Sequence, residues 1–320
     1  MSEASQSARG TFLAEVLANE RLCDEHYRLI LDFERFPPTE AGQFIQLLCR
    51  PPAEQDSLSV VDWQEGTPPQ FTQPELTDQE TMLRRPLSLA GRRDHAGGRT
   101  ELDVIYRKVG TGTRWLSGVK PGDPLSVLGP LGNAFPISQD KPAAVLVGGG
   151  VGIPPMLYLA EALRNAGKSS VAFSGARSAS LLPLRLSPSV PVSPEGAPGL
   201  CVAEFAAVDT PSVVTTDDGS LGFGGLITQP LVRWLESGGV EPGQVVVYSC
   251  GPEPMMRAVG ELCLSRGIEC WLSLERHMAC GMGTCQSCVC KLREDNDRGW
   301  AYRLCCTDGP VFAAAEVVWD

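Results

Sequence analysis

The sequence is poor in histidine and in positive charge. Its three histidines, His26, His95 and His277, are too few and too scattered to form a histidine metal site or a proton relay. Acidic residues outnumber basic ones by 38 to 27, which gives a net charge of −11. Such a charge argues against a partner that is a nucleic acid or an anionic membrane surface.

Targeting and membrane signals are also missing. The N-terminus lacks the basic and apolar regions of a secretory signal. The longest uncharged run, 143–160, is broken by three consecutive glycines and by Pro154–Pro155, so it fits a strand, a loop and a helix start better than a membrane span. We therefore predict a cytoplasmic protein with no membrane partner.

Cysteine, in contrast, is abundant and clustered. Seven of the twelve cysteines lie between Cys270 and Cys306. A cytoplasmic chain keeps its thiols reduced, so metal binding is a better explanation of the cluster than disulfides.

The pattern of the chain changes near residue 141. Before it, short runs of alternating apolar and polar residues predict a small antiparallel barrel over 1–140, with a long Pro- and Gln-rich loop insertion at 51–80. After it, strands and helices alternate over 141–275, which predicts a mostly parallel α/β sheet. Within that region we expect a strand at 200–208. The cysteines occupy 276–320, where little regular pattern is visible.

The cysteine loop has the spacing C-x4-C-x2-C at Cys280, Cys285 and Cys288. This is the spacing of plant-type [2Fe–2S] ferredoxins, which need a fourth, distant cysteine. Glycines at 281 and 283 permit the loop to wrap a cluster. The two residues between Cys285 and Cys288 suggest that both thiolates reach the same iron. Zinc is the rival, because four thiolates also suit it, and a structural loop without metal is a third interpretation.

The fourth ligand should come from the segment LCCTDG, which offers Cys305 and Cys306. Cys290 lies next to the loop but off its pattern, and we interpret it as a bystander.

Two glycine-containing turns predict a nucleotide site. Each turn ends an apolar strand and opens a helix, where backbone N–H groups can approach a pyrophosphate. Neither turn is specific alone, since many α/β turns need glycine for packing. The candidate residues are Gly148, Gly149, Gly150, Gly152, Cys250, Gly251 and Pro252.

Two further segments fit a flavin. Arg85 can neutralise a phosphate, and Ser88, three residues later, can donate to a flavin ring nitrogen. Gly112 and Thr113 precede a short helix and form another candidate phosphate-binding position. A solvated arginine on an edge strand is the alternative for Arg85.

Together these segments resemble one family. They follow the order found in dihydroorotate dehydrogenase electron-transfer subunits, which belong to the ferredoxin-reductase superfamily. The motifs that carry the resemblance are RRPLSLAG, IYRKVGTGTRWLS, VLGPLGNAF, GGGVGIPPM, TDDGSLGFGGLIT, SCGPEPMM, CGMGTCQSC and CTDGPVF.

The resemblance implies an antiparallel β-barrel FAD domain, a Rossmann-like parallel α/β NAD domain and a C-terminal [2Fe–2S] segment. It implies that Cys306, which stands before x-D-G-P, is the fourth cluster ligand beside Cys280, Cys285 and Cys288. The FAD segments implied by the resemblance are Arg85, Pro86, Leu87, Ser88, Ile105, Tyr106, Arg107, Gly112 and Thr113.

The predicted function is what this resemblance and its cofactors imply. A partner subunit with FMN would oxidise dihydroorotate, and electrons would pass through [2Fe–2S] and FAD to NAD+, because flavin exchanges both single electrons and hydride. The alternatives keep the cofactors and change the partner to a hydrogenase, a sulfite reductase or a ferredoxin-linked transhydrogenase. A zinc-stabilised interaction protein is the alternative from another class.

Overall fold

The computed structural model describes residues 9–52, 83–237 and 241–319. Most of the predicted loop insertion at 51–80 lies outside them. The first part of the chain forms a closed barrel with the order β1-β2-β5-β4-β3-β6, in which all pairs are antiparallel. Its elements are β1 (Gly10–Arg21), β2 (His26–Phe33), β3 (Phe44–Leu47), β4 (Arg85–Asp94), β5 (Thr100–Arg107), β6 (Pro124–Leu131) and the short helix α1 (Thr111–Leu116).

The second part is a seven-stranded sheet with the order β10-β9-β8-β7-β11-β12-β15. All pairs are parallel except the last, so the predicted Rossmann-like sheet is confirmed. Its strands are β7 (Ala143–Gly149), β8 (Ser169–Ala176), β9 (Ser212–Thr216), β10 (Phe223–Gly224), β11 (Val245–Cys250), β12 (Glu269–Ser273) and β15 (Val311–Ala313).

The helices of this part are short. They are α2 (Ile153–Asn165), α3 (Ala203–Ala206), α4 (Thr228–Glu236) and α5 (Glu253–Ser265), with 3-10 turns η1 (Gly150–Gly152), η2 (Ala179–Leu181) and η3 (Pro242–Gln244). No described helix is long and apolar enough to cross a membrane.

The strand expected at 200–208 is wrong. Within this segment, Ala203–Ala206 forms α3, and both Phe205 and Val202, the extended residue that precedes the helix, are buried. A short apolar run of this kind fits either a strand or a single buried helical turn, so the sequence pattern did not distinguish the two. The strand of this region is β9, which begins at Ser212.

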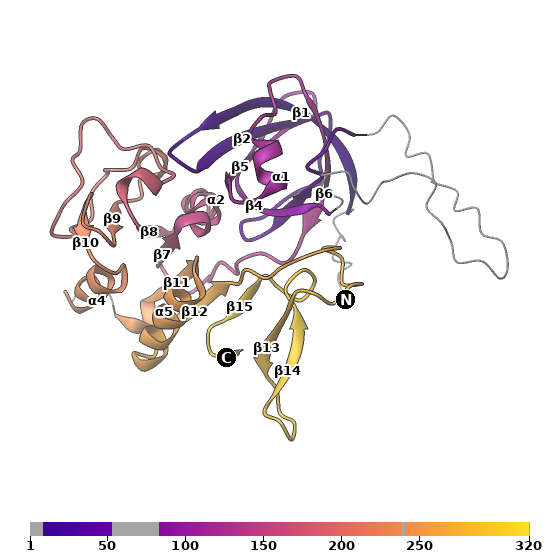
Figure 1. The fold of residues 1–320 in the computed structure, drawn as a ribbon. Helices are drawn as coiled ribbons and strands as arrows, with labels where there is room; N and C mark the ends of the chain where they lie inside the picture. The colour runs from indigo at the N-terminus through magenta and orange to yellow at the C-terminus, as the bar shows by residue number, and fades with distance from the viewer. Residues whose placement is uncertain (1–8, 53–82, 238–240, 320) are drawn as a thin grey trace.

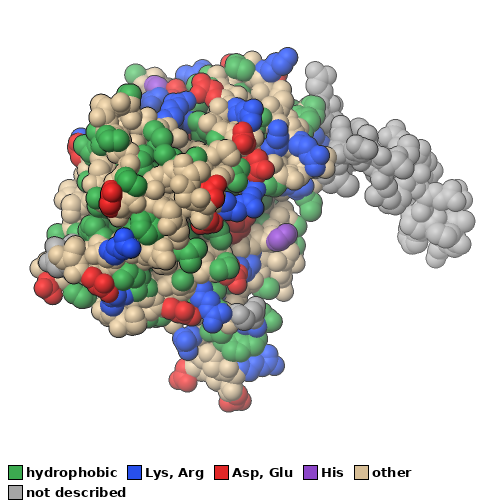
Figure 2. All heavy atoms as spheres, turned by 60° about the vertical axis from the view of Figure 1, so that its left-hand side comes forward, with side chains coloured by type: hydrophobic (Ala, Val, Ile, Leu, Met, Phe, Trp, Pro, Cys, Tyr) green, Lys and Arg blue, Asp and Glu red, His purple; other side chains and the backbone are tan. Residues whose placement is uncertain are grey.

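The last part of the chain adds a separate three-stranded sheet, β14-β13-β16, and one strand of the large sheet. β13 (Val289–Arg293) and β14 (Trp300–Leu304) form a hairpin that projects from the molecule (Figure 1), and β16 is Val317–Val318. Acidic and basic side chains are interspersed over the face seen in Figure 2, including the projecting hairpin. β15 pairs antiparallel with β12, so the cysteine segment completes the α/β sheet.

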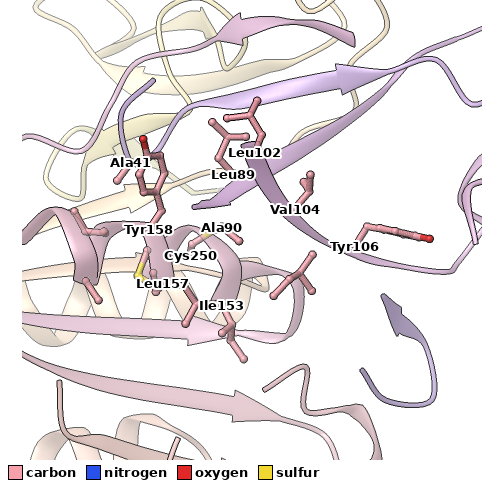
Figure 3. Close-up of a cluster of buried hydrophobic side chains, with 14 of the residues drawn as sticks. Ala41, Leu89, Ala90, Leu102, Val104, Tyr106, Ile153, Leu157, Tyr158 and Cys250 are labelled. Atoms are coloured by element: carbon pink, nitrogen blue, oxygen red, sulfur yellow. The ribbon is translucent and has the colours of Figure 1, made fainter. Parts of the chain in front are cut away.

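The barrel and the α/β sheet share one hydrophobic core. Buried side chains of α2 lie against those of the barrel, with Tyr158 reaching toward Ala41 (Figure 3). The Tyr158 hydroxyl donates to the carbonyl oxygen of Thr39 at 2.8 Å. This continuous core fixes the two glycine turns of the sheet relative to the barrel strands.

The end of the barrel holds the C-terminal segment through Gly132 and Asn133. The Asn133 amide donates to the carbonyl oxygens of Asp308 and Val311 at 3.1 and 2.9 Å, and accepts from the Val311 N–H at 2.9 Å. A Cβ on Gly132 would lie 2.6 Å from Cδ of Pro310, so only glycine fits there. The motifs LGNAF and CTDGPVF therefore contact each other in the folded protein.

We predict that Asn133→Ala lowers the free energy of unfolding by about 3 kcal/mol, because it removes three hydrogen bonds and leaves the backbone N–H and C=O of buried Val311 without this partner. Urea unfolding followed by tryptophan fluorescence measures the change. Asn296→Ala is the matched control, since its amide bonds only within the exposed turn of the hairpin. Its expected loss is under about 1 kcal/mol, and equal losses in both variants would contradict the role of Asn133.

Candidate functional site

The two predicted glycine turns meet at the carboxyl edge of the sheet. β7 and β11 are neighbours, and Cys250 pairs in register with Gly148. A Cβ on Gly251 would lie 3.0 Å from the backbone nitrogen of Gly149. The structure thus brings both turns together where open α/β sheets bind ligands.

The glycines serve two different purposes there. A Cβ on Gly152 would lie 2.2 Å from the carbonyl oxygen of Cys250, and one on Gly149 would lie 2.9 Å from Cδ of Pro252. At both positions glycine is needed because a side chain would clash with the neighbouring turn. Gly150 differs, because its φ is +53° and nothing lies within 4 Å of its Cβ position. An anionic ligand can therefore approach the backbone at Gly150.

Cys250 itself is a buried thiol. Burial raises its pKa to about 12, against an opposing hydrogen bond with Ser273. A thiol held protonated is a poor nucleophile, so Cys250 suits a packing role beside a ligand.

The predicted flavin segments form one strip on the barrel. Four successive residues of β4 are half-buried while the next three are buried, a pattern that a strand with one solvated face does not give. A ligand can lie along this half-buried stretch of β4, which we call the flavin strip. The four residues are Arg85, Pro86, Leu87 and Ser88.

The start of α1 lies against this strip. A Cβ on Gly112 would lie 3.2 Å from Nε of Arg85, so the two segments predicted to face a phosphate are adjacent. The Thr113 hydroxyl accepts from the backbone N–H groups of Val109 and Gly110 at 2.9 and 3.1 Å. It therefore shapes the turn that precedes the helix.

The third flavin segment, on β5, is mostly interior. Ile105 and Tyr106 are buried, and the Tyr106 hydroxyl donates to Oδ1 of Asn19 at 3.0 Å. Arg107 is half-buried and pairs with Glu25 at 2.6 Å. The structure thus places this segment next to the strip but engages both polar side chains within the protein.

The four predicted cluster ligands stand as two pairs. The Cys280 sulfur accepts from the backbone N–H of Cys285 at 3.3 Å, and Cys306 hydrogen-bonds with Cys288. Over the described residues, no three His, Cys, Asp or Glu side chains are grouped closely enough to hold one metal ion. The expectation that the thiolates of Cys285 and Cys288 reach the same iron stays a prediction.

The neighbouring cysteines Cys305 and Cys306 face different partners. The Cys305 thiol hydrogen-bonds with Cys290. This hydrogen bond, together with burial, raises the pKa of Cys305. The same hydrogen bond lowers the pKa of Cys290, against the opposing effect of burial. Cys306 instead lies near Cys288 and Cys280, and burial is the main cause that raises its pKa to about 12. The off-pattern Cys290 is thus the partner of the cysteine that faces away from the loop.

The loop backbone points N–H groups at sulfur. The Cys280 sulfur also accepts from Met282 N–H at 3.5 Å, and Cys306 accepts from Gly283 N–H. Gly281 and Gly283 have φ of +70° and +89°, as expected of a loop that wraps a ligand. These donors and four thiols fit a thiolate-bound cluster, whose sulfurs carry negative charge.

One side of the loop is open to solvent. Cys285 is exposed, and a hydrogen bond with Ser287 is the largest cause that lowers the pKa of Cys285 to about 6. Cys288 and Cys306 are buried against the barrel side of the segment. The loop therefore has an inner pair and an outer pair of thiols.

Sequence reasoning missed two residues of this region. Asn133 holds the segment that carries Cys306, and Gln46 of β3 lies fully buried against Gly281. Neither residue belongs to a cysteine or glycine pattern. A polar residue inside the apolar run FIQLL was the one available signal for Gln46.

Comparison with known proteins agrees with this arrangement. Residues 275–318 match the family model described as the iron–sulfur cluster binding domain of dihydroorotate dehydrogenase B. The electron transfer subunit of dihydroorotate dehydrogenase B (NAD(+)) from Caldanaerobacter subterraneus is 33% identical over 96% of this chain and 98% of its own. The chain belongs to this family. The subunit of the same name from Geobacillus thermodenitrificans is 40% identical over 75% of this chain and 81% of its own.

Solved structures share the fold of this family member. The NADH-dependent reduced ferredoxin-NADP oxidoreductase structure is 25% identical with a TM-score of 0.67, covering 97% of this chain and 91% of the other. An Amycolatopsis cytochrome P450 reductase, at 21% identity and a TM-score of 0.54, covers 83% of this chain and 70% of the other and shows the fold alone.

Family membership confirms the predicted class, an electron-transfer oxidoreductase subunit with flavin and iron–sulfur cofactors. It favours the dihydroorotate dehydrogenase subunit over the hydrogenase, sulfite reductase and transhydrogenase alternatives. The iron–sulfur description of the family model also favours iron over zinc.

We predict that Gly281→Ala reduces iron and sulfide bound per chain to below about half of the unmodified value. A side chain at this φ costs about 1–2 kcal/mol, and its Cβ would also lie 2.7 Å from Cδ of Gln46. Gly299→Ala is the matched control, with φ of +71° and nothing near the Cβ position. Equal cofactor content in the two variants would show that the contact with Gln46 is unimportant.

Proposed function

We propose that this protein is the electron-transfer subunit of an NAD-dependent dihydroorotate dehydrogenase of pyrimidine biosynthesis. Its partner would be an FMN-containing catalytic subunit that oxidises dihydroorotate and holds the general base for that reaction. When bound, [2Fe–2S] supplies single-electron exchange, and FAD converts single electrons into a hydride for NAD+. The observation that carries the proposal is the arrangement of four thiols with backbone donors beside the flavin strip, in a chain of this family.

The four ligands of [2Fe–2S] would be Cys280, Cys285, Cys288 and Cys306. The contact of Cys306 with Cys288, and the separate contact of Cys305 with Cys290, support Cys306 as the fourth ligand. The buried inner pair keeps water from one side of the site. The outer pair, half-buried Cys280 and exposed Cys285, offers the side on which a partner subunit can approach.

FAD would lie along the strip on β4. Arg85 would neutralise a phosphate, Ser88 would donate to the ring, and Gly112 with Thr113 would present the backbone of α1. The backbone of Ile105, Tyr106 and Arg107 would border the site, since their side chains are engaged within the protein.

NAD would occupy the carboxyl edge of the sheet. The open backbone at Gly150 supports a pyrophosphate there, with Gly148, Gly149 and Gly152 shaping the turn. Cys250, Gly251 and Pro252 would border the nicotinamide.

We propose that the domain limits are 1–140, 141–275 and 276–320, with β15 of the last segment completing the sheet of the second. The proposed setting is the cytoplasm, with no nucleic-acid or membrane partner, in keeping with the net charge of −11.

The function is tested with the purified full chain and with the chain reconstituted with its catalytic subunit. We expect flavin bands and iron–sulfur absorption in the visible spectrum, and dihydroorotate-dependent reduction of NAD+ only when both subunits are present. A colourless chain that contains zinc would refute the cofactor assignment. A coloured chain that supports no such reduction with the partner would refute the substrate assignment.

We predict that Cys306→Ser loses most of its iron and its cluster absorption, whereas Cys305→Ser keeps them. Serine at 306 removes a ligand, but serine at 305 removes only the contact with Cys290. Iron and sulfide analysis with the visible spectrum measures both. Equal retention in the two variants would contradict the choice of Cys306.

A further inference from the structure

Gln46 joins the flavin strip to the cysteine loop. It lies on β3, where its backbone pairs in register with Pro86 of β4. Residues of a strand alternate between faces, and Ile45 and Leu47 belong to the barrel core while Phe44 packs with Cys288 and Cys306. Gln46, two residues from Phe44, therefore points out of the barrel toward the cysteine segment.

The Gln46 carboxamide stands directly against the loop. A Cβ on Gly281 would lie 2.7 Å from Cδ of Gln46 and 2.8 Å from each of Nε2 and Oε1. Gly281 follows Cys280, whose sulfur already accepts from two backbone N–H groups. The amide is thus next to the sulfur-bearing end of the loop.

This amide is fully buried and unpaired. Gln46 has no exposed surface, and neither Nε2 nor Oε1 has a hydrogen-bond partner among the described residues. A buried amide that lacks a hydrogen-bond partner destabilises the folded state. Native proteins therefore retain such an amide where a bound ligand supplies the missing partner. The carboxamide lies against Gly281, next to Cys280, so the cluster would lie on the side toward which Nε2 can donate.

We infer that Gln46 is a positioning residue that donates a hydrogen bond from Nε2 to a sulfur of the cluster and raises its reduction potential. The inference rests on the proposed [2Fe–2S] site. Reduction adds negative charge to the cluster, and an N–H donor stabilises that charge more in the reduced state than in the oxidised state. Because Gln46 lies beside Pro86, the residue that would tune the reduction potential of the cluster borders the flavin strip.

The test is an EPR-monitored redox titration of the full chain with its cofactors, using Gln46→Leu and Gln46→Glu. Both variants lack the N–H donors, and glutamate keeps the size of the side chain if leucine impairs folding. We expect the oxidised-to-reduced ratio of the cluster at a fixed potential to rise about tenfold, which is about 59 mV for a one-electron couple. Ile45→Val, on the opposite face of β3 in the barrel core, is the control for packing and should leave the potential unchanged.

A direct readout uses glutamine labelled with ¹⁵N in the side chain. Coupling of ¹⁵N to the reduced cluster is expected in the unmodified chain and absent in Gln46→Glu. An unchanged potential in a variant that retains its iron, an equal shift in Ile45→Val, or a shift confined to the flavin would overturn the inference. Lack of iron and sulfide in the unmodified chain would instead refute the proposed cluster, so the two failures are distinguishable.

Discussion

The contact between the end of the barrel and the C-terminal segment is the constraint on which the rest of the structure depends. Asn133 bonds to backbone groups on both sides of Pro310, and Gly132 leaves room for that ring. The segment held in this way carries Cys306 on one side and β15 on the other. One small polar contact therefore positions both the fourth candidate ligand and the last strand of the large sheet.

The hydrophobic core that the barrel and the sheet share also positions the carboxyl edge of the sheet, where we propose that NAD binds. Because α2 packs on the barrel, the core connects β4 to the helix that follows the turn containing Gly150. The flavin strip, the glycine turns and the cysteine loop consequently form a rigid sequence of neighbouring sites. Electron transfer benefits from such fixed separations, since the protein contributes by holding cofactors in place and tuning their surroundings.

Much of the fold was predictable because the sequence patterns that predict it are local. Alternation predicted the barrel strands, buried apolar runs predicted β7 and β11, and cysteine spacing predicted the loop. What could not be predicted depends on contacts between distant segments. The partners of Cys305 and Cys306, and the bonds of Asn133 to residues 175 and 178 positions away, follow only from the assembled fold. The error at 200–208 arose where a short apolar run fitted either a strand or one helical turn.

The antiparallel strand β15 also has a consequence for biosynthesis. Residues 311–313 are translated after Cys306, so the outer edge of β12 stays unpaired until the last candidate ligand has been synthesised. An exposed edge strand is a template for aggregation. A nascent chain that stops before Cys306 would therefore lack a candidate cluster ligand and also leave the edge of β12 unpaired and prone to aggregation.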